Sequence, residues 1–214
     1  VTELPDNMSY VHGAMIEPLA VAVHGVKQMG DVTGLKIAVL GAGPIGNLVA
    51  QTAKGMGAEK VMITDVSQLR LDIAEKCGVD VCVNTKNVDF GDAMIEAFGP
   101  DKADVIYDCA GNNVTMGQAI KYARKGSVIV LVAVFAGMAE VDLAVANDHE
   151  LDIKSTMMYR HEDYIDAIRL VNEKKVDLEP LVTREFPFEQ YLDAYKFIDE
   201  HREEAMKIII NVQE

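Results

Sequence analysis

The stretch IAVLGAGPIG, residues 37–46, decides the fold of this chain. An apolar run leads directly into a turn with three glycines, and a helix-like pattern begins at Pro44 and Ile45. The spacing G-x-G-x-x-G between a strand and a helix is typical of a turn that binds a dinucleotide, although isolated matches are often ordinary turns. The surrounding sequence has to decide whether this turn binds a phosphate or only reverses the chain.

Strand-like and helix-like runs alternate after this turn. We expect strands at 36–40, 60–64, 81–84, 104–108 and 127–135, separated by helices at 44–56, 67–77, 89–98 and 113–123. The strands are nearly continuous in apolar residues, as expected when helices cover both faces of a parallel sheet. The predicted fold class is therefore α/β, a doubly wound parallel sheet of the Rossmann type.

The two ends of the chain depart from this alternation. A helix is expected from about Glu17 and Pro18 to residue 29, because proline is tolerated in a first helical turn. Past residue 150 the pattern is less regular. Its expected elements are extended segments at 151–158, 179–188 and 207–212 and helices at about 161–173 and 188–201. We interpret this C-terminal αβ tail as packing onto something else, and we expect the chain to be a piece of a longer protein.

Each glycine of the turn has a physical role. Gly41 permits the tight turn, Gly43 lets the backbone approach a pyrophosphate with no Cβ in the way, and Gly46 lets the helix lie close to the strand. The helix that starts at Pro44 and Ile45 offers unpaired N–H groups and a positive dipole end to the phosphate. The turn is therefore predicted to bind a dinucleotide.

An acid follows at the position that this interpretation requires. The second expected strand ends in Asp65, nineteen residues after Gly46. A carboxylate there accepts hydrogen bonds from the ribose hydroxyls and repels a 2′-phosphate, so Asp65 predicts NAD rather than NADP. The alternative is that Asp65 caps the following helix. Arg70, one helical turn further on, either stacks on the adenine or is a solvated surface arginine.

Composition argues against several other classes of function. The formal net charge of −14 disfavours nucleic acid and anionic lipid as partners, because their phosphates would be repelled. We find no apolar run long enough for a membrane span and no secretory signal, so we expect a cytoplasmic protein without membrane association. Three cysteines without a C-x-x-C pair predict reduced thiols. His24, within an apolar helix, is expected to be packed and hydrogen-bonded rather than a metal ligand.

Five stretches give the chain a resemblance to a known family. They are IEPLAVAVHG (16–25), VLGAGPIGNL (39–48), VMITDVSQLRLDIA (61–74), DCAG (108–111) and PLVTREFPFEQYLDAYKFI (180–198). With these stretches the chain resembles the zinc-type medium-chain dehydrogenases over essentially its whole length, and among them the sorbitol (L-iditol) dehydrogenases. The resemblance implies an oxidoreductase that transfers hydride from a secondary alcohol or polyol to NAD with the help of a catalytic zinc.

The resemblance also implies how the chain is divided. Residues 1–16 would end an N-terminal catalytic domain that this chain lacks, residues 17–160 would form the NAD-binding domain, and residues 161–214 would return to the catalytic domain. In the family that domain supplies the other zinc ligands, so this fragment alone is expected to be inactive. Family members pair through the sheet edge after residues 127–135, which implies a homo-oligomer, either a dimer or a tetramer.

Further site residues are carried over at matching positions. Glu17, in the I-E-P-L stretch, matches a family glutamate that reaches the catalytic zinc directly or through a water. Without the resemblance it would be interpreted as a helix-start acid favoured by the helix dipole. Nicotinamide contacts in the family come from two backbone segments, which are here Leu131, Val132 and Ala133, and Met157, Met158 and Tyr159.

The identity of the substrate stays open. Sorbitol dehydrogenases typically carry F-R-Y where this chain has MMYR at 157–160, so Met158 stands where an arginine would touch a polyol hydroxyl. This departure favours 2,3-butanediol or other secondary alcohols, and a threonine dehydrogenase-like enzyme is a further alternative. Two other hypotheses are a stand-alone nucleotide-binding module without catalysis and a zinc-free reductase of the same superfamily. Such reductases generally prefer NADP, which Asp65 disfavours.

Overall fold

The computed structural model describes residues 2–212, and its central feature is a six-stranded parallel sheet in the order β3-β2-β1-β4-β5-β6. The strands are β1 (Lys36–Leu40), β2 (Lys60–Asp65), β3 (Val81–Asn84), β4 (Val105–Asp108), β5 (Val128–Leu131) and β6 (Asp152–Ser155). The strand order reverses between β1 and β4, so the carboxyl ends of these two strands open a crevice at the switch point. This topology confirms the predicted doubly wound sheet.

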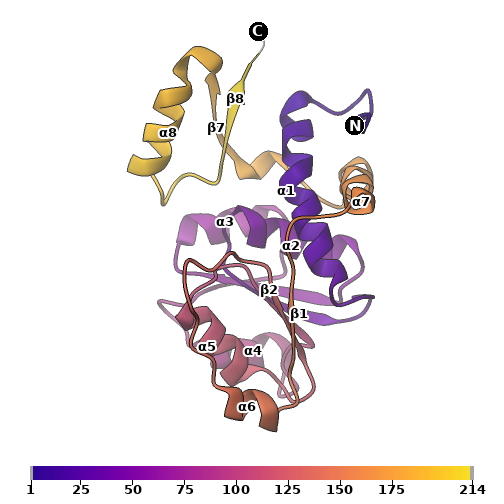
Figure 1. Cartoon of the computed structure of the whole chain (residues 1–214), viewed down its shortest axis with the longest axis vertical. Helices are drawn as coiled ribbons and strands as arrows, with labels where there is room; N and C mark the ends of the chain where they lie inside the picture. Colours follow the sequence, from indigo (N-terminus) through magenta and orange to yellow (C-terminus); the bar gives the residue numbers. More distant parts are fainter. Residues whose placement is uncertain (1, 213–214) are drawn as a thin grey trace.

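Helices cover both faces of the sheet (Figure 1). The core of one face is built with α1 (Tyr10–Lys27), α2 (Pro44–Gly55), α3 (Gln68–Lys76) and α7 (His161–Asn172). The core of the other is built with α4 (Phe90–Phe98), α5 (Asn113–Tyr122) and α6 (Leu143–Asp148). Within β1, Ile37 and Val39 pack into the first core, whereas Ala38 and Leu40 pack into the second. Because both faces are buried, the strands read as continuous apolar runs.

The first helix begins earlier than the sequence predicts. α1 starts at Tyr10, because the side chain of Ser9 accepts a hydrogen bond from the backbone N–H of His12 at 3.1 Å and caps the helix. The predicted start near Glu17 and Pro18 is therefore wrong, and Pro18 lies inside the helix. The missing N–H is tolerated because a long apolar face of α1 is buried against α2 and the sheet.

The elements around β5 and β6 also differ from the prediction. β5 ends at Leu131 rather than at residue 135. Val132 and Ala133 leave the strand because their backbone N–H groups both donate to the carbonyl of Asp108, at 2.9 and 3.0 Å. β6 is likewise shorter than predicted, and α6 occupies a stretch for which the sequence predicts no element.

The C-terminal tail consists of two parts. α7 packs along α1 and contributes Ala167 and Leu170 to the core of the sheet. A second unit contains β7 (Val182–Pro187), α8 (Tyr191–Glu200) and β8 (Lys207–Asn211), with short 3₁₀ turns at Glu179–Leu181 and Phe188–Gln190. β7 and β8 form a parallel two-stranded sheet, and this unit lies at the opposite end of the molecule from α6 (Figure 1). Its exposed apolar side chains form a stripe of Phe188, Tyr191, Leu192, Tyr195 and Ile198.

The cysteines are free thiols with raised pKa values. Burial, together with the charge of Asp177, raises the pKa of Cys77 to about 12. Burial and three acidic side chains raise the pKa of Cys82 to about 11, and burial with the charge of Asp108 raises that of Cys109 further. These thiols are protonated at neutral pH and are poor nucleophiles.

Among residues 2–212, the structure contains no helix with both the length and the apolar character that crossing a membrane requires.

The contact between β4 and α1 generates a test of the fold. Tyr107 is fully buried and donates its hydroxyl to the carbonyl of Val26 at 3.0 Å. We expect Tyr107→Phe to lower the free energy of unfolding by about 1 kcal/mol, because it removes this buried hydrogen bond. Urea denaturation followed by circular dichroism measures the change. The control Tyr195→Phe alters an exposed ring on α8 and should cost less than about 0.5 kcal/mol. Equal losses in the two variants would contradict this account.

Candidate functional site

Four loops form one rim at the carboxyl edge of the sheet. They are the glycine turn after β1 and the loops after β4, β5 and β6. Backbone hydrogen bonds tie each strand end to the next: Cys109 N–H to Leu40 O at 2.9 Å, Val132 N–H to Asp108 O at 2.9 Å, and Thr156 N–H to Leu131 O at 3.1 Å. Because all the strands are parallel, every predicted contact in these loops lies on the same edge.

The glycine turn contains two glycines that the protein itself requires. Gly41 has a φ of +96°, in the left-handed region that favours glycine. A Cβ on Gly46 would lie 1.8 Å from the carbonyl oxygen of Gly41, so only glycine lets α2 begin this close to the turn. A Cβ on Gly43 would meet no protein atom within 4 Å. Protein packing therefore does not explain the glycine at position 43, and its missing side chain leaves open space at the turn.

The N-terminus of α2 is free of side-chain caps. Gly43 is the N-cap residue and Pro44 begins the helix. The first helical hydrogen bond runs from the N–H of Asn47 to the carbonyl of Gly43 at 2.9 Å, so the N–H groups of Ile45 and Gly46 have no helical acceptor. Side chains cap α1, α4 and α5, by contrast. The start of α2 is therefore suited to an anion, which the helix dipole also favours.

Asp65 joins the end of β2 to the glycine turn. Its Oδ2 accepts the backbone N–H of Ala42 at 2.7 Å, and its Oδ1 accepts those of Val66 and Ser67 at 2.8 and 2.9 Å. The N-cap of α3 is Ser67, so Asp65 shapes the turn before that helix without being its N-cap residue. The guanidinium of Arg70 lies 3.9 Å from Oδ2. One carboxylate thus connects the two elements between which a dinucleotide would lie.

A cleft of about 360 Å³ lies beside the glycine turn. Four residues predicted for the site are among its lining, namely Gly41, Gly43, Asp65 and Arg70. The sequence did not single out the hydroxyl and amide side chains that line the same cleft, which are Thr64, Thr85, Asn112, Thr115 and Gln118. These groups can donate or accept hydrogen bonds from a sugar or a base.

Asp108 supports the site, although the sequence alone suggested no role for it. It is fully buried, and its Oδ1 accepts the backbone N–H groups of Ala110 and Gly111 at 3.0 and 3.1 Å. Its Oδ2 accepts the hydroxyl of Thr115 at 3.2 Å. Asp108 therefore holds the loop after β4 in the shape that forms one wall of the cleft. A signal was present in the sequence, because Asp108 ends an apolar strand just as Asp65 does.

The loop after β5 continues the rim beyond this cleft. Gly111 has a φ of +68°, and a Cβ there would lie 2.6 Å from the Cβ of Ala133. The loop after β4 is therefore in contact with the predicted segment Leu131, Val132 and Ala133. That segment does not line the cleft of Gly41, so the predicted contacts form two adjacent groups rather than one pocket.

The loop after β6 carries the remaining predicted contacts. Met157 and Met158 expose 66% and 56% of their surface, whereas Tyr159 is half-buried. Met158 has a φ of +59°, a conformation that is uncommon for a residue with a side chain. A Cβ on Gly25 of α1 would lie 3.4 Å from Val132 and 3.7 Å from Thr156, so α1 packs against both outer loops.

Glu17 is exposed on α1, about two turns after the helix begins. The helix dipole therefore does not explain this acid, because its effect is confined to the first turn. Within residues 2–212, no three His, Cys, Asp or Glu side chains are arranged to hold a metal ion. His24 is hydrogen-bonded to Asp163 at 2.7 Å, which confirms the prediction of a packed histidine. A metal at Glu17 would need ligands from elsewhere.

Comparison with known proteins agrees with this geometry. A family profile described as zinc-binding dehydrogenase matches residues 44–173. The chain is 33% identical over 216 residues to sorbitol dehydrogenase 1 of Saccharomyces cerevisiae, covering 98% of this chain and 60% of the relative. It is similar to the structure of 2R,3R-butanediol dehydrogenase from Bacillus subtilis, with 27% identity, a TM-score of 0.90 and coverage of 99% and 60%. A short chain alcohol dehydrogenase from Escherichia coli complexed with NADH is 25% identical, with a TM-score of 0.87 and coverage of 97% and 61%. The chain thus spans about 60% of the length of the curated relatives it matches.

The two kinds of glycine in the turn predict different mutational effects. We expect Gly46→Ala to lower the free energy of unfolding by at least about 2 kcal/mol, because the new Cβ overlaps the Gly41 carbonyl. Gly43→Ala is the matched control, since its Cβ enters open space and its φ is −64°. It should lower stability by no more than about 1 kcal/mol, the usual cost of alanine at an N-cap position. Thermal denaturation of both variants makes the comparison, and similar losses at the two positions would contradict the structure of the turn.

Proposed function

The chain belongs to the zinc-binding dehydrogenase family, and on that premise we propose that it is the NAD-binding part of an oxidoreductase that acts on secondary alcohols or polyols. The observation that carries this proposal is the uncapped start of α2 beside the Asp65 carboxylate, with open space at Gly43 between them. These groups fit a diphosphate and a ribose. The complex of one similar structure with NADH supports a nicotinamide cofactor.

Each part of the rim has a task in holding the cofactor. Bound NAD supplies the hydride acceptor. The N–H groups of Ile45 and Gly46 would donate to its pyrophosphate, where Gly43 leaves room. Asp65 would accept the ribose hydroxyls, and Arg70 would stack on the adenine. The outer loops at 131–133 and 157–159 would contact the nicotinamide. The contribution of this chain is thus orientation of the cofactor, so that the reacting carbons meet in a fixed geometry.

Zinc fits the described residues only in part. Glu17 is an exposed carboxylate that can accept a metal, but residues 2–212 contain no group of further ligands around it. We therefore assign no reaction step to a metal on this chain alone. Glu17 is proposed to join a zinc site whose other ligands come from outside these residues, and the chain by itself is proposed to bind NAD without turnover.

The second unit of the tail is proposed to pack on the part of the relatives that this chain does not span. A two-stranded sheet such as β7 and β8 is marginally stable alone, and the stripe on α8 is exposed. The chain covers about 60% of its curated relatives, which leaves a domain-sized remainder. The proposed division is 1–16, 17–160 and 161–214, with the qualification that α1 runs across residue 17 and α7 packs on α1.

Met158 favours a second candidate substrate. Methionine has no donor for a polyol hydroxyl, whereas arginine at this place would have several. A small secondary alcohol such as 2,3-butanediol is therefore proposed beside sorbitol, with a threonine dehydrogenase-like reaction as the other alternative. A substrate panel on the intact protein distinguishes them. Absence of turnover with every alcohol would favour a nucleotide-binding module.

A homo-oligomer is proposed through β6. This strand is one of the two outer strands of the six-stranded sheet, and Asp152, Ile153 and Ser155 on it are exposed. A free strand edge is prone to pairing with another chain, which a second copy would satisfy.

The choice between NAD and NADP tests the role of Asp65. We expect the chain to bind NAD at least about tenfold more tightly than NADP, because the carboxylate repels a 2′-phosphate. Asp65→Asn should remove most of this difference, and it keeps one of the two oxygens that accept backbone N–H groups. Asp72→Asn, an exposed acid on α3, is the control and should keep the preference. Isothermal titration calorimetry measures the affinities, and equal binding of NAD and NADP by the unaltered chain would contradict the proposal.

The zinc proposal is tested on the intact protein supplied with zinc. We expect Glu17→Gln to reduce turnover by about tenfold or more. Residues that support a metal site commonly change metal affinity or activity by that factor when they are mutated. NAD affinity and thermal stability should not change, since Glu17 is exposed. Glu75→Gln, an exposed acid on α3, serves as the control. Unaltered turnover in Glu17→Gln would remove this residue from the metal site.

A further inference from the structure

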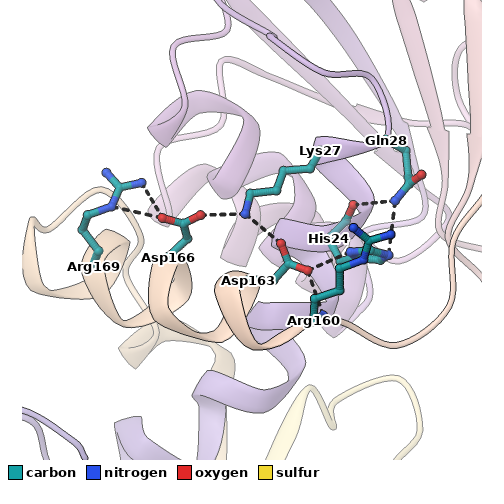
Figure 2. Close-up of polar contacts among 7 residues, drawn as sticks. All are labelled: His24, Lys27, Gln28, Arg160, Asp163, Asp166 and Arg169. Carbon is teal, nitrogen blue, oxygen red and sulfur yellow. Dashed lines mark hydrogen bonds and ion pairs between the residues drawn. The ribbon is translucent and has the colours of Figure 1, made fainter. Parts of the chain in front are cut away.

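A cluster of polar contacts joins the last turn of α1 to the first turns of α7 (Figure 2). Its centre is Asp163, which is 2% exposed and accepts hydrogen bonds from Nδ1 of His24 and Nζ of Lys27, both at 2.7 Å. Lys27 also pairs with Asp166 at 2.6 Å, and Asp166 is bound by Arg169 at 2.9 Å. Asp163 is thus a buried carboxylate with donors on both of its oxygen atoms.

The charge state of Asp163 follows from these contacts. Burial opposes its ionisation, but hydrogen bonds from Lys27, the backbone of Arg160 and His24 outweigh burial and hold its pKa below the ordinary value. The carboxylate is therefore charged at neutral pH, and its two oxygens remain acceptors for all three donors.

The ring of His24 is oriented by a second contact. Nε2 of Gln28 lies 3.2 Å from Nε2 of His24 and 3.3 Å from the His24 carbonyl oxygen. An amide nitrogen can only donate, so Nε2 of His24 accepts and Nδ1 carries the proton. His24 therefore donates its Nδ1–H to Asp163 in a fixed orientation.

The same carboxylate holds the end of the loop that follows β6. The backbone N–H of Arg160 donates to Oδ2 of Asp163 at 2.9 Å, just before α7 begins. At the start of this loop, Nζ of Lys154 donates to the carbonyl of Gln28 at 3.1 Å. Lys154 thus ties the chain just before residues 156–160 to the end of α1. Asp163, which α1 binds, holds the end of the same loop.

Within this loop the half-buried Tyr159 packs against the core and lies 6.0 Å from the ring of Tyr164, whereas the two methionines before it do not pack in this way. Met157 and Met158 are exposed, and Met158 has a φ of +59°. A non-glycine residue stays in that conformation only where the surrounding structure imposes it, and such residues cluster at functional sites. The two anchors contribute to that constraint, together with the packing of Tyr159 and the approach of Thr156 to Gly25.

We propose that Asp163 is a positioning residue for the nicotinamide end of NAD, because it fixes the loop 156–160 through the N–H of Arg160 while His24 and Lys27 fix Asp163. Lys154 is the second anchor of the same loop. This inference rests on the proposed function, which assigns that loop to the nicotinamide. The lining of the cleft beside the glycine turn includes no member of the cluster. The cluster should therefore affect one half of the dinucleotide and leave the other half unchanged.

Asp163→Ala tests the inference through two ligands, because alanine removes the oxygen that accepts the N–H of Arg160, whereas asparagine would keep one. NADH carries the nicotinamide and ADP-ribose lacks it, so calorimetric titration with both separates the two halves. We expect Asp163→Ala to weaken NADH binding by about tenfold and to leave ADP-ribose binding within about twofold. A merely structural role would weaken both ligands alike. The control is Asp166→Ala, which removes an acid bound to the same Lys27 but not to Arg160, and both affinities should persist.

The outcomes separate the two proposals. Failure of the unaltered chain to bind ADP-ribose would overturn the proposed function. If Asp163→Ala binds ADP-ribose and also binds NADH as tightly as the unaltered chain does, the positioning role alone is overturned. If circular dichroism finds Asp163→Ala unfolded, Lys154→Met decides instead, because it removes the other anchor at a half-exposed site. A selective loss of NADH affinity in Lys154→Met supports the inference, and unchanged affinity overturns it.

Discussion

The close approach of α2 to the turn after β1 is the constraint on which the site depends. The backbone at Gly46 lies so near the Gly41 carbonyl that no Cβ fits between them. This approach points the free amides at the start of α2 toward the crevice where the strand order reverses. It also brings the N–H of Ala42 within 2.7 Å of Asp65. The glycine turn and the end of β2 are thereby held as one unit.

The chain's net charge of −14 opposes the binding of a diphosphate such as the one in the proposed cofactor. Its overall field repels phosphates, so attraction has to be local. For the proposed cofactor, backbone amides and the dipole of α2 would supply it without a cluster of basic side chains. The Asp65 carboxylate accepts three backbone N–H groups and lies near Arg70, so its own charge is compensated close to the turn. Local dipoles thus work against the unfavourable long-range field.

α1 is the common support of the outer half of the rim. It accepts the buried hydroxyl of Tyr107 from β4, contacts Val132 after β5 and Thr156 after β6, and binds α7 through Asp163. A single helix therefore sets the relative positions of loops that follow three different strands. The two halves of the proposed cofactor site consequently rest on different supports, α2 with the glycine turn on one side and α1 on the other.

The sequence by itself determined the order of strands and helices, the parallel sheet, the glycine turn after β1 and the acid Asp65 at the end of β2, because apolar periodicity, turn residues and motif spacing are local properties. It also indicated that His24 is packed, but not against what. Only the tertiary structure decided the start of α1, the end of β5, the role of Asp108 and the pairing of His24 with Asp163, 139 positions away. Those features depend on contacts between segments distant in the chain, and burial of the apolar face of α1 outweighs the local signal of Pro18. No local pattern records such contacts.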